Sequence, residues 1–264
     1  SGNTIKNMAL ENRFTLCNMV VEFSAFTGII APDQKVIDYL KDRPYAPNHK
    51  WSDAVNFWNS LYSDKNAIFD EVIEIDSSQI YPSVSWGLSP EQSIAINDSI
   101  PNINEITNPD KKEELKSSLI YMGLESGQSL MHLPIDAAFI GSCTNARLDD
   151  LRSAAKILKG NKVSPDVLAI CTPASADIKR NAEREGIDQI FKDSGFQWRE
   201  PGCSLCFYAG GEGFLPKQRV ITSTNRNFRG RQGPAVRSHL ASPATVAASA
   251  IAGKIIPSIE VCKK

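Results

Sequence analysis

The chain opens with apolar residues at helical spacing. In residues 7–28, NMALENRFTLCNMVVEFSAFTG, apolar positions recur every three or four residues and the pattern stops at Gly28. Such spacing favours a helix, and glycine is a common helix terminus. A second stretch of this kind, residues 31–42, has Pro32 near its start, where proline suits the first helical turn. Residues 1–45 are therefore predicted to be helical.

The next part of the chain has a weaker pattern. Residues 44–64 mix proline, asparagine, tryptophan and tyrosine, and AIFDEVIEID at residues 67–76 then begins with strand-like alternation. We therefore expect a domain boundary near residue 64. Residues 82–117 are rich in asparagine, proline and charge, which is typical of a long surface connection.

From residue 134 onward, apolar strands alternate with amphipathic helices. Strands are predicted within residues 134–145, 166–175 and 218–228, and helices within residues 148–160, 176–195 and 242–254. This alternation predicts parallel βαβ units, an α/β layered domain and a site outside the carboxyl ends of the strands. Three turns whose side chains could bind a ligand or take part in catalysis fall at that edge, namely residues 141–145, 201–206 and 225–231.

Composition narrows the function classes. The 264 residues are 42% hydrophobic, which is enough for a full core, and 29 basic residues balance 30 acidic ones. This balance argues against nucleic acid or an anionic membrane surface as a partner. No run reaches the roughly 20 apolar residues that a spanning helix needs, and the start SGNTIKNMAL lacks the order of a signal peptide. We expect a cytoplasmic protein without a membrane partner.

The cysteines are the main candidates for chemistry. Six of them are scattered along a chain that is long enough to be stabilised by a hydrophobic core without disulfide bonds, which argues against a disulfide framework. Cys203 and Cys206 form a CxxC pair, whose spacing alone fits a disulfide, a redox pair, half of a zinc site or the ligands of a cluster. Cys143 follows a predicted strand two βα units earlier, so the fold could bring three thiolates to one point.

The number of candidate ligands separates these alternatives in part. A structural zinc site needs four ligands, and His49, His132 and His239 show no ligand spacing. Cys171 also ends a predicted strand but is more typical of a buried core thiol. Three cysteines suit a [4Fe–4S] cluster with one iron open as a Lewis acid for a hydroxyl and a carboxylate.

An arginine-rich turn, NRNFRGR, accompanies these cysteines. It supplies Arg226, Arg229 and Arg231, and guanidinium groups suit bidentate carboxylate recognition. Taken one at a time, each feature also has a plain structural explanation: an unused CxxC turn, a solvated arginine loop and a helix-capping Ser/Thr turn. Their shared position at one predicted sheet edge favours the functional interpretation.

Four stretches in order, FIGSCTNARLDDLRSAA, EPGCSLC, TSTNRNFRGRQGP and SHLASPATVAASAIAGK, resemble the aconitase superfamily, most closely its isopropylmalate dehydratase large subunits. The similarity runs essentially end to end. It implies that residues 65–264 form a three-layer α/β/α cluster-binding domain with a mostly parallel sheet. It also implies that residues 1–64 are the tail of a preceding aconitase-like α/β domain.

The resemblance also implies residue roles. Cys143, Cys203 and Cys206 would hold a [4Fe–4S] cluster, Arg226 and Arg231 would be catalytic and bind substrate, and Asn225 would bind substrate beside them.

Three positions depart from the family or vary within it. Arg229 occupies a position at which the family varies, so no role is carried over to it. Ala174 and Ala176 replace two glycines of the family's usual Pro-Gly-Ser-Gly turn, and alanine would be strained there if the turn needed a positive φ.

The implied activity is a hydro-lyase reaction of leucine biosynthesis. It dehydrates a dicarboxylate, 2-isopropylmalate, to 2-isopropylmaleate and rehydrates that to 3-isopropylmalate. A small subunit completes a heterodimer and supplies a serine base. Because Ser1 matches a point well inside such a large subunit, the chain is expected to be its carboxy-terminal portion, inactive alone. The alternatives are a homoaconitase or aconitase-type hydro-lyase and a non-catalytic, metal-stabilised interaction domain.

Overall fold

The structure, a computed structural model that describes residues 1–261, separates into two compact units. They comprise residues 1–80 and 81–264, so the division falls later than the boundary expected near residue 64. The alternating stretch 67–76 forms no strand, and the prediction of one there was wrong. Its side chains are exposed and no neighbouring strand pairs with it, so alternation alone does not produce a sheet.

The first unit is helical, as predicted for most of its length. Its α-helices are α1 (Asn3–Asn7), α2 (Leu10–Met19), α3 (Gln34–Leu40) and α4 (Trp51–Asn59), with 3₁₀ turns at Val20–Phe23, Asn48–Lys50 and Ser77–Gln79. No strand lies within residues 1–80, so this unit by itself supplies no part of a sheet.

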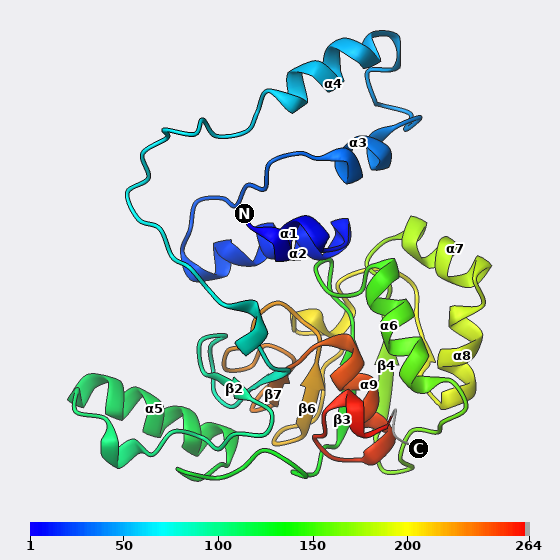
Figure 1. Cartoon of the computed structure of the whole chain (residues 1–264). Coiled ribbons are helices and arrows are strands. Elements are labelled where there is room, and N and C mark those ends of the chain that lie inside the picture. The colour runs from blue at the N-terminus through cyan, green and yellow to red at the C-terminus, as the bar shows by residue number, and fades with distance from the viewer. Residues whose placement is uncertain (262–264) are drawn as a thin grey trace. The chain divides into compact units, whose positions relative to one another are not determined.

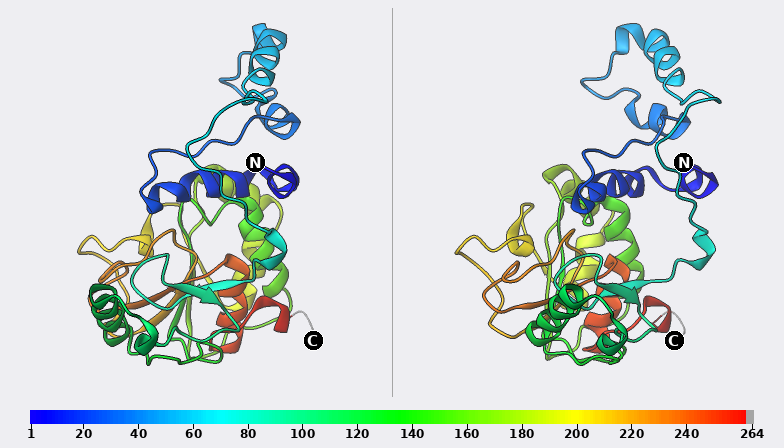
Figure 2. Two further views of the ribbon diagram at one scale, coloured as in Figure 1. Left: turned by 60° about the vertical axis from the view of Figure 1, so that its left-hand side comes forward. Right: turned by 90° about the vertical axis from the view of Figure 1, so that its left-hand side faces the viewer.

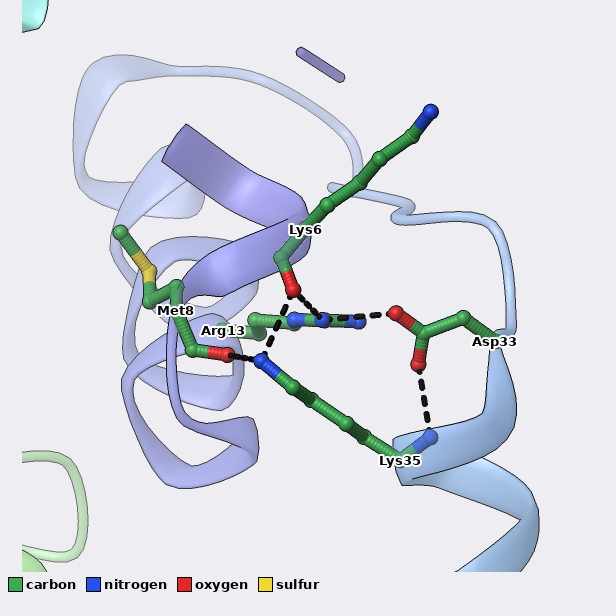
Figure 3. Close-up of polar contacts among 5 residues, drawn as sticks. All are labelled: Lys6, Met8, Arg13, Asp33 and Lys35. Atoms are coloured by element: carbon green, nitrogen blue, oxygen red, sulfur yellow. Dashed lines mark hydrogen bonds and ion pairs between the residues drawn. The ribbon is translucent and has the colours of Figure 1, made fainter. Parts of the chain in front are cut away.

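A polar network ties the first three helices together (Figure 3). The Arg13 Nη2 atom donates to the Lys6 carbonyl at 2.9 Å and to Asp33 Oδ2 at 2.7 Å. The Lys35 ammonium donates to the carbonyls of Lys6 at 2.8 Å and Met8 at 3.0 Å, while its backbone N–H is capped by Asp33. The side chains of Arg13 in α2 and Lys35 in α3 therefore both bind carbonyl groups at the end of α1.

This network takes the place of a hydrophobic core. Within residues 1–80 only Arg13 and Ile37 are buried, whereas Phe26 and Tyr45 are fully exposed. The Arg13 hydrogen bond holds the pKa of Asp33 below its usual range, so the ion pair is intact at neutral pH. Charge-assisted hydrogen bonds, rather than apolar burial, hold this unit together.

The second unit is an α/β domain built on a parallel sheet (Figure 1). Its strands are β3 (Ala137–Ile140), β4 (Leu168–Cys171), β5 (Gln197–Trp198), β6 (Arg219–Thr222) and β7 (Arg237–Leu240), in the order β5-β4-β3-β6-β7. Its helices are α5 (Pro109–Met122), α6 (Leu148–Leu158), α7 (Ala176–Arg184), α8 (Ile187–Ser194) and α9 (Pro243–Ala252). All four strand pairs are parallel, which confirms the predicted class.

One predicted connection is structured instead. Residues 82–117 contain the antiparallel pair β1 (Ser83–Ser85) and β2 (Ser93–Ala95) and most of α5. Helix α5 begins where the Asn108 side chain caps the Lys111 N–H at 3.0 Å and Pro109 takes the first helical position. It was missed because lysine and glutamate dominate its first half, while its buried residues come later, at Leu115, Leu119 and Met122.

Two further differences concern boundaries. The single helix predicted over residues 176–195 is two helices, α7 and α8, because Gly186 adopts a left-handed φ of 72° between them. Strand β7 carries Arg237, Ser238 and His239, so its sequence lacks the apolar run of a central strand.

The two faces of the sheet are covered differently. Helices α6, α8 and α9 pack on the face that carries Ala138, Ile140 and Ile221. The opposite face, with Phe139 and Val220, packs against Leu205, Phe214 and Val236 from the β5–β6 and β6–β7 connections. The yellow and orange loops of Figure 2 lie on the side away from the green helix α6. In the described residues, the third layer is therefore made of loops.

No helix within residues 1–261 combines the length and the apolar character that crossing a bilayer requires.

A buried polar pair lies in the last two strands. The side chain of His239 is fully buried, and its Nδ1 atom lies 2.7 Å from the Ser85 carbonyl, to which it must donate. Its Nε2 atom therefore accepts from the Arg219 guanidinium at 2.8 Å. Burial, and next the Arg219 charge, lower the pKa of His239 to about 3.

The His239 environment predicts acid sensitivity. Because the folded-state pKa lies below the unfolded value, stability is complete above pH ~6.5 and falls by ~1.4 kcal/mol per pH unit below it, until about pH 3. Urea unfolding at pH 7.5 and 5.5 should show a drop about 1.4 kcal/mol larger in the native chain than in His239→Gln. Equal drops in the two proteins would show that His239 titrates normally.

The junction between the units predicts a protease site. Every residue from 60 to 82 is exposed, and the only regular element there is the 3₁₀ turn Ser77–Gln79. Brief chymotrypsin treatment should cut first at Tyr62 or Phe69, as seen by mass spectrometry, because exposed irregular backbone fits a protease cleft. The double variant Tyr62→Ser/Phe69→Ser should slow that first cut, whereas Phe57→Ser, a change at an exposed position within α4, should not. First cleavage within residues 84–261 would contradict the prediction.

Candidate functional site

The three predicted turns follow the carboxyl ends of sheet strands. Residues 141–145 follow β3, residues 201–206 follow β5, and residues 225–231 follow β6. Because β3 and β6 are paired neighbours, the turn with Cys143 and the turn with the arginines emerge side by side. The candidate site is therefore assembled at the edge expected for a parallel sheet.

The Cys143 turn is a tight structure with an exposed thiol. Gly141 starts it, and a Cβ there would lie 2.2 Å from the Phe139 ring, so only glycine fits. Ser142 has a φ of 112°, and its Oγ atom accepts from the Thr144 N–H at 3.2 Å. Both flanking residues are buried while Cys143 is exposed. The backbone thus presents this thiol outward.

The CxxC pair lies on a short 3₁₀ helix, Ser204–Cys206. The Cys206 N–H donates to the Cys203 carbonyl at 2.8 Å, which closes the turn. Cys203 is exposed, whereas Cys206 is 9% exposed and joins the small hydrophobic cluster with Leu205. Both thiols are free, so this pair is not a disulfide in the structure.

Arg231 joins the arginine turn to the CxxC turn. Its Nε atom donates to the Cys206 carbonyl at 2.6 Å, and its Nη2 atom lies 3.5 Å from Cys206 Sγ and 3.2 Å from Asn225 Oδ1. The guanidinium also lies 5.5 and 5.3 Å from the ring centroids of Phe207 and Phe228. Hydrogen bonds and cation–π contacts together fix its orientation.

The three thiols share one electrostatic environment. Burial raises the pKa of Cys206, and Arg231 opposes this rise by its charge and its hydrogen bond. Cys203 and Cys143 both raise the pKa of Cys206 further, because a second thiolate nearby disfavours the first. The fold therefore brings Cys143 and Cys203 within electrostatic range of Cys206, whose thiol also lies beside Arg231.

Two buried amides that sequence reasoning missed anchor the turns. Gln232 donates to the Leu205 carbonyl at 2.9 Å and accepts from the Ser238 hydroxyl at 2.7 Å. Asn227 donates to the Gly87 carbonyl at 2.6 Å. Both stand in a polar run, and nothing in the sequence marks them as buried. Their burial shows that the arginine turn is packed into the domain rather than solvated throughout.

The other arginines of the turn differ in their surroundings. Arg226 is exposed, beside Asn225. Arg229 is also exposed but contacts α5, where it donates to the Ser117 hydroxyl and lies 5.4 Å from the Tyr121 ring. Arg229 is thus occupied by a structural contact with α5.

Of the remaining cysteines, one is a core thiol of the second unit. Cys171 is fully buried at the end of β4, and burial raises its pKa well above the usual value, so it is a neutral thiol. Cys17 lies in α2 of the first unit, and Cys262 lies outside the described residues.

The alanines at the departure from the family pattern are not strained. Neither Ala174 nor Ala176 has a positive φ. Ser175 caps α7 by accepting from the Ile178 N–H at 3.2 Å, and Ala176 is the first helical residue.

The donor groups do not converge on a single point. Within residues 1–261, no group of three or more His, Cys, Asp or Glu side chains is placed to hold one metal ion.

Comparison with known proteins agrees with the motifs. The profile of the aconitase family (aconitate hydratase) matches residues 1–253. A 3-isopropylmalate dehydratase large subunit from Cupriavidus necator is 54% identical over 255 residues, 96% of each chain. A 3-isopropylmalate dehydratase large subunit 1 from Bradyrhizobium diazoefficiens is 47% identical over 97% of this chain, and a large subunit from Psychrobacter cryohalolentis is 46% identical over 97%.

The coverage of these relatives differs. The chain spans nearly the whole of the Cupriavidus protein but only 54% and 55% of the other two. The family match covers almost the entire chain, in both structural units. The chain therefore belongs to the aconitase family.

Proposed function

We propose that the chain is the large-subunit portion of an iron–sulfur hydro-lyase of leucine biosynthesis. The reaction interconverts 2-isopropylmalate and 3-isopropylmalate through 2-isopropylmaleate, with a small subunit as partner. The observation that carries the proposal is the grouping of Cys143, Cys203 and Cys206 with Arg231 at one sheet edge. The names of the relatives favour this substrate over citrate or homocitrate.

The three thiols suit a [4Fe–4S] cluster better than a single ion. In such a cluster each cysteine binds a different iron, so its ligands stand farther apart than those of one ion. The electrostatic effect of Cys143 and Cys203 on Cys206 supports one shared set of ligands. When bound, the cluster would supply an iron without a protein ligand, a Lewis acid for the substrate hydroxyl.

The chain's arginines would bind and orient the dicarboxylate. Arg226 is exposed at the sheet edge and can present a planar guanidinium to a carboxylate. Arg231 is held by Asn225 and two phenylalanine rings, so little side-chain entropy remains to be lost when substrate binds. The family resemblance assigns proton removal to a serine of the small subunit, which makes that partner necessary for turnover.

The cluster proposal predicts stoichiometric iron uptake. Anaerobic reconstitution with ferrous iron and sulfide should give about four irons per chain and a broad visible absorption band. Cys143→Ser should lose both, because only two thiolates remain. Cys17→Ser, a matched change in the first unit, should keep them. Failure of the native chain to bind iron, or tight binding of one zinc instead, would refute the proposal.

The substrate proposal predicts unequal effects of two neighbouring arginines. In the reconstituted chain, reduced by one electron with dithionite to the paramagnetic [4Fe–4S]⁺ state, 2-isopropylmalate binding can be followed by the change it makes in the cluster's electron paramagnetic resonance spectrum, without turnover. Arg226→Gln should raise the Kd at least about tenfold, since charge-assisted hydrogen bonds are worth ~1.5–3 kcal/mol. Arg229→Gln should change it less than about twofold, because Arg229 contacts α5. Equal effects would contradict the assigned roles.

A further inference from the structure

We propose that Ser223 is a positioning residue that fixes the Cys143 turn against the arginine turn. The proposal rests on the proposed function only for the identity of the group that Cys143 binds. Ser223 directly follows β6 and is fully buried, two residues before Asn225. In sequence it lies between β6 and the arginine turn, while its hydroxyl contacts are made with the Cys143 turn.

Ser223 makes hydrogen bonds at both ends of the Cys143 turn. Its Oγ atom accepts from the Gly141 N–H at 3.1 Å and lies 3.2 Å from the Gly141 carbonyl and 3.1 Å from the Asn145 carbonyl. The Ser223 carbonyl accepts from Asn145 Nδ2 at 2.9 Å. One residue thus spans the first and last positions of the five-residue turn that presents the thiol.

These bonds matter because the turn has a demanding backbone. Ser142 holds a positive φ that non-glycine residues rarely adopt, and such conformations persist only where the surroundings impose them. The Ser142 hydroxyl is engaged locally with Thr144. The hydrogen bonds that link Gly141 and Asn145 to the end of β6 all run to Ser223.

The hydroxyl can be removed without breaking the sheet. The Ser223 backbone N–H donates to the Phe139 carbonyl at 3.0 Å and continues the β3–β6 pairing, independently of the side chain. Ser223→Ala therefore removes the hydroxyl contacts with Gly141 and Asn145, and it leaves the ladder and the Asn145 Nδ2 bond to the Ser223 carbonyl in place. This separates a role in positioning Cys143 from a role in holding the sheet together.

The first test needs no cluster. Hydrogen exchange of the intact 264-residue chain, read by mass spectrometry, should be at least tenfold faster over residues 141–145 in Ser223→Ala. The matched control is Ser249→Ala, which removes an equally buried hydroxyl that bonds to Ile256 in the helical layer. It should leave residues 141–145 unchanged, and residues 201–206 should be unchanged in both variants. Unaltered exchange at 141–145 in Ser223→Ala would overturn the proposal.

The second test measures cluster retention. After anaerobic reconstitution, an iron chelator should bleach Ser223→Ala at least tenfold faster than Ser249→Ala. Asn145→Ala should show a similar acceleration, because it removes the other side-chain bond between the turn and the end of β6, from Asn145 Nδ2 to the Ser223 carbonyl.

The outcomes separate the two proposals. Equal bleaching of Ser223→Ala and Ser249→Ala would overturn the positioning role while leaving the cluster in place. If the native chain binds no iron, the proposed function fails, and the exchange measurement alone still decides whether Ser223 orders the turn.

Discussion

The pairing of β3 with both β4 and β6 decides where every candidate ligand lies. Parallel strands end at the same edge, so each residue that follows a strand is delivered there. The ladder is buried on both faces, which fixes its register, because a slip by one residue would turn Phe139 and Ile140 to the wrong sides. The Cys143 turn and the arginine turn follow neighbouring strands as a consequence of this pairing.

The right-handed rule for parallel connections explains why loops, and not helices, carry the candidate residues on one face of the sheet. The chain runs from β3 to β4 to β5 in one direction, with α6, α7 and α8 as the connections, and then returns to β6 on the other side of β3. Reversing the direction places the following connections on the opposite face. The segments that carry Cys203, Cys206 and the arginines are those connections, which therefore cover the face with Phe139.

Loops on a sheet face need partners for their polar groups, and buried amides and hydroxyls supply them. Gln232 satisfies the Leu205 carbonyl, and Asn227 satisfies the Gly87 carbonyl. An unsatisfied buried polar group costs ~1–3 kcal/mol, so these side chains are as important to the loop layer as apolar residues are to the helical layer. They allow a cysteine-bearing turn to be ordered without a helix behind it.

The sequence predicted the parts of the molecule in which local pattern and tertiary role agree. Strands β3, β4 and β6 are short apolar runs, and α6 and α9 have clear periodicity and end signals, so all five were found. Strand β7 is polar because His239 and Arg219 satisfy each other inside the domain, a pairing that no local pattern reveals. Ser223 and Gln232 were missed for the same reason, since a buried hydrogen-bonding role depends on partners about 80 and 30 residues away.

At the carboxyl edge, little positive charge is available to stabilise the deprotonated form of Cys206. Arg231 is the one cation that opposes the rise in the Cys206 pKa, whereas burial and two neighbouring thiols promote it. Deprotonating all three cysteines would place up to three negative charges beside that single guanidinium, which is unfavourable until a positive centre arrives. A bound metal centre is usually the largest charge in such a site and displaces the thiol protons as it binds. The structure therefore places Cys143 and Cys203 where their negative charge would act on Cys206, and the proposed iron–sulfur cluster would offset that repulsion when bound.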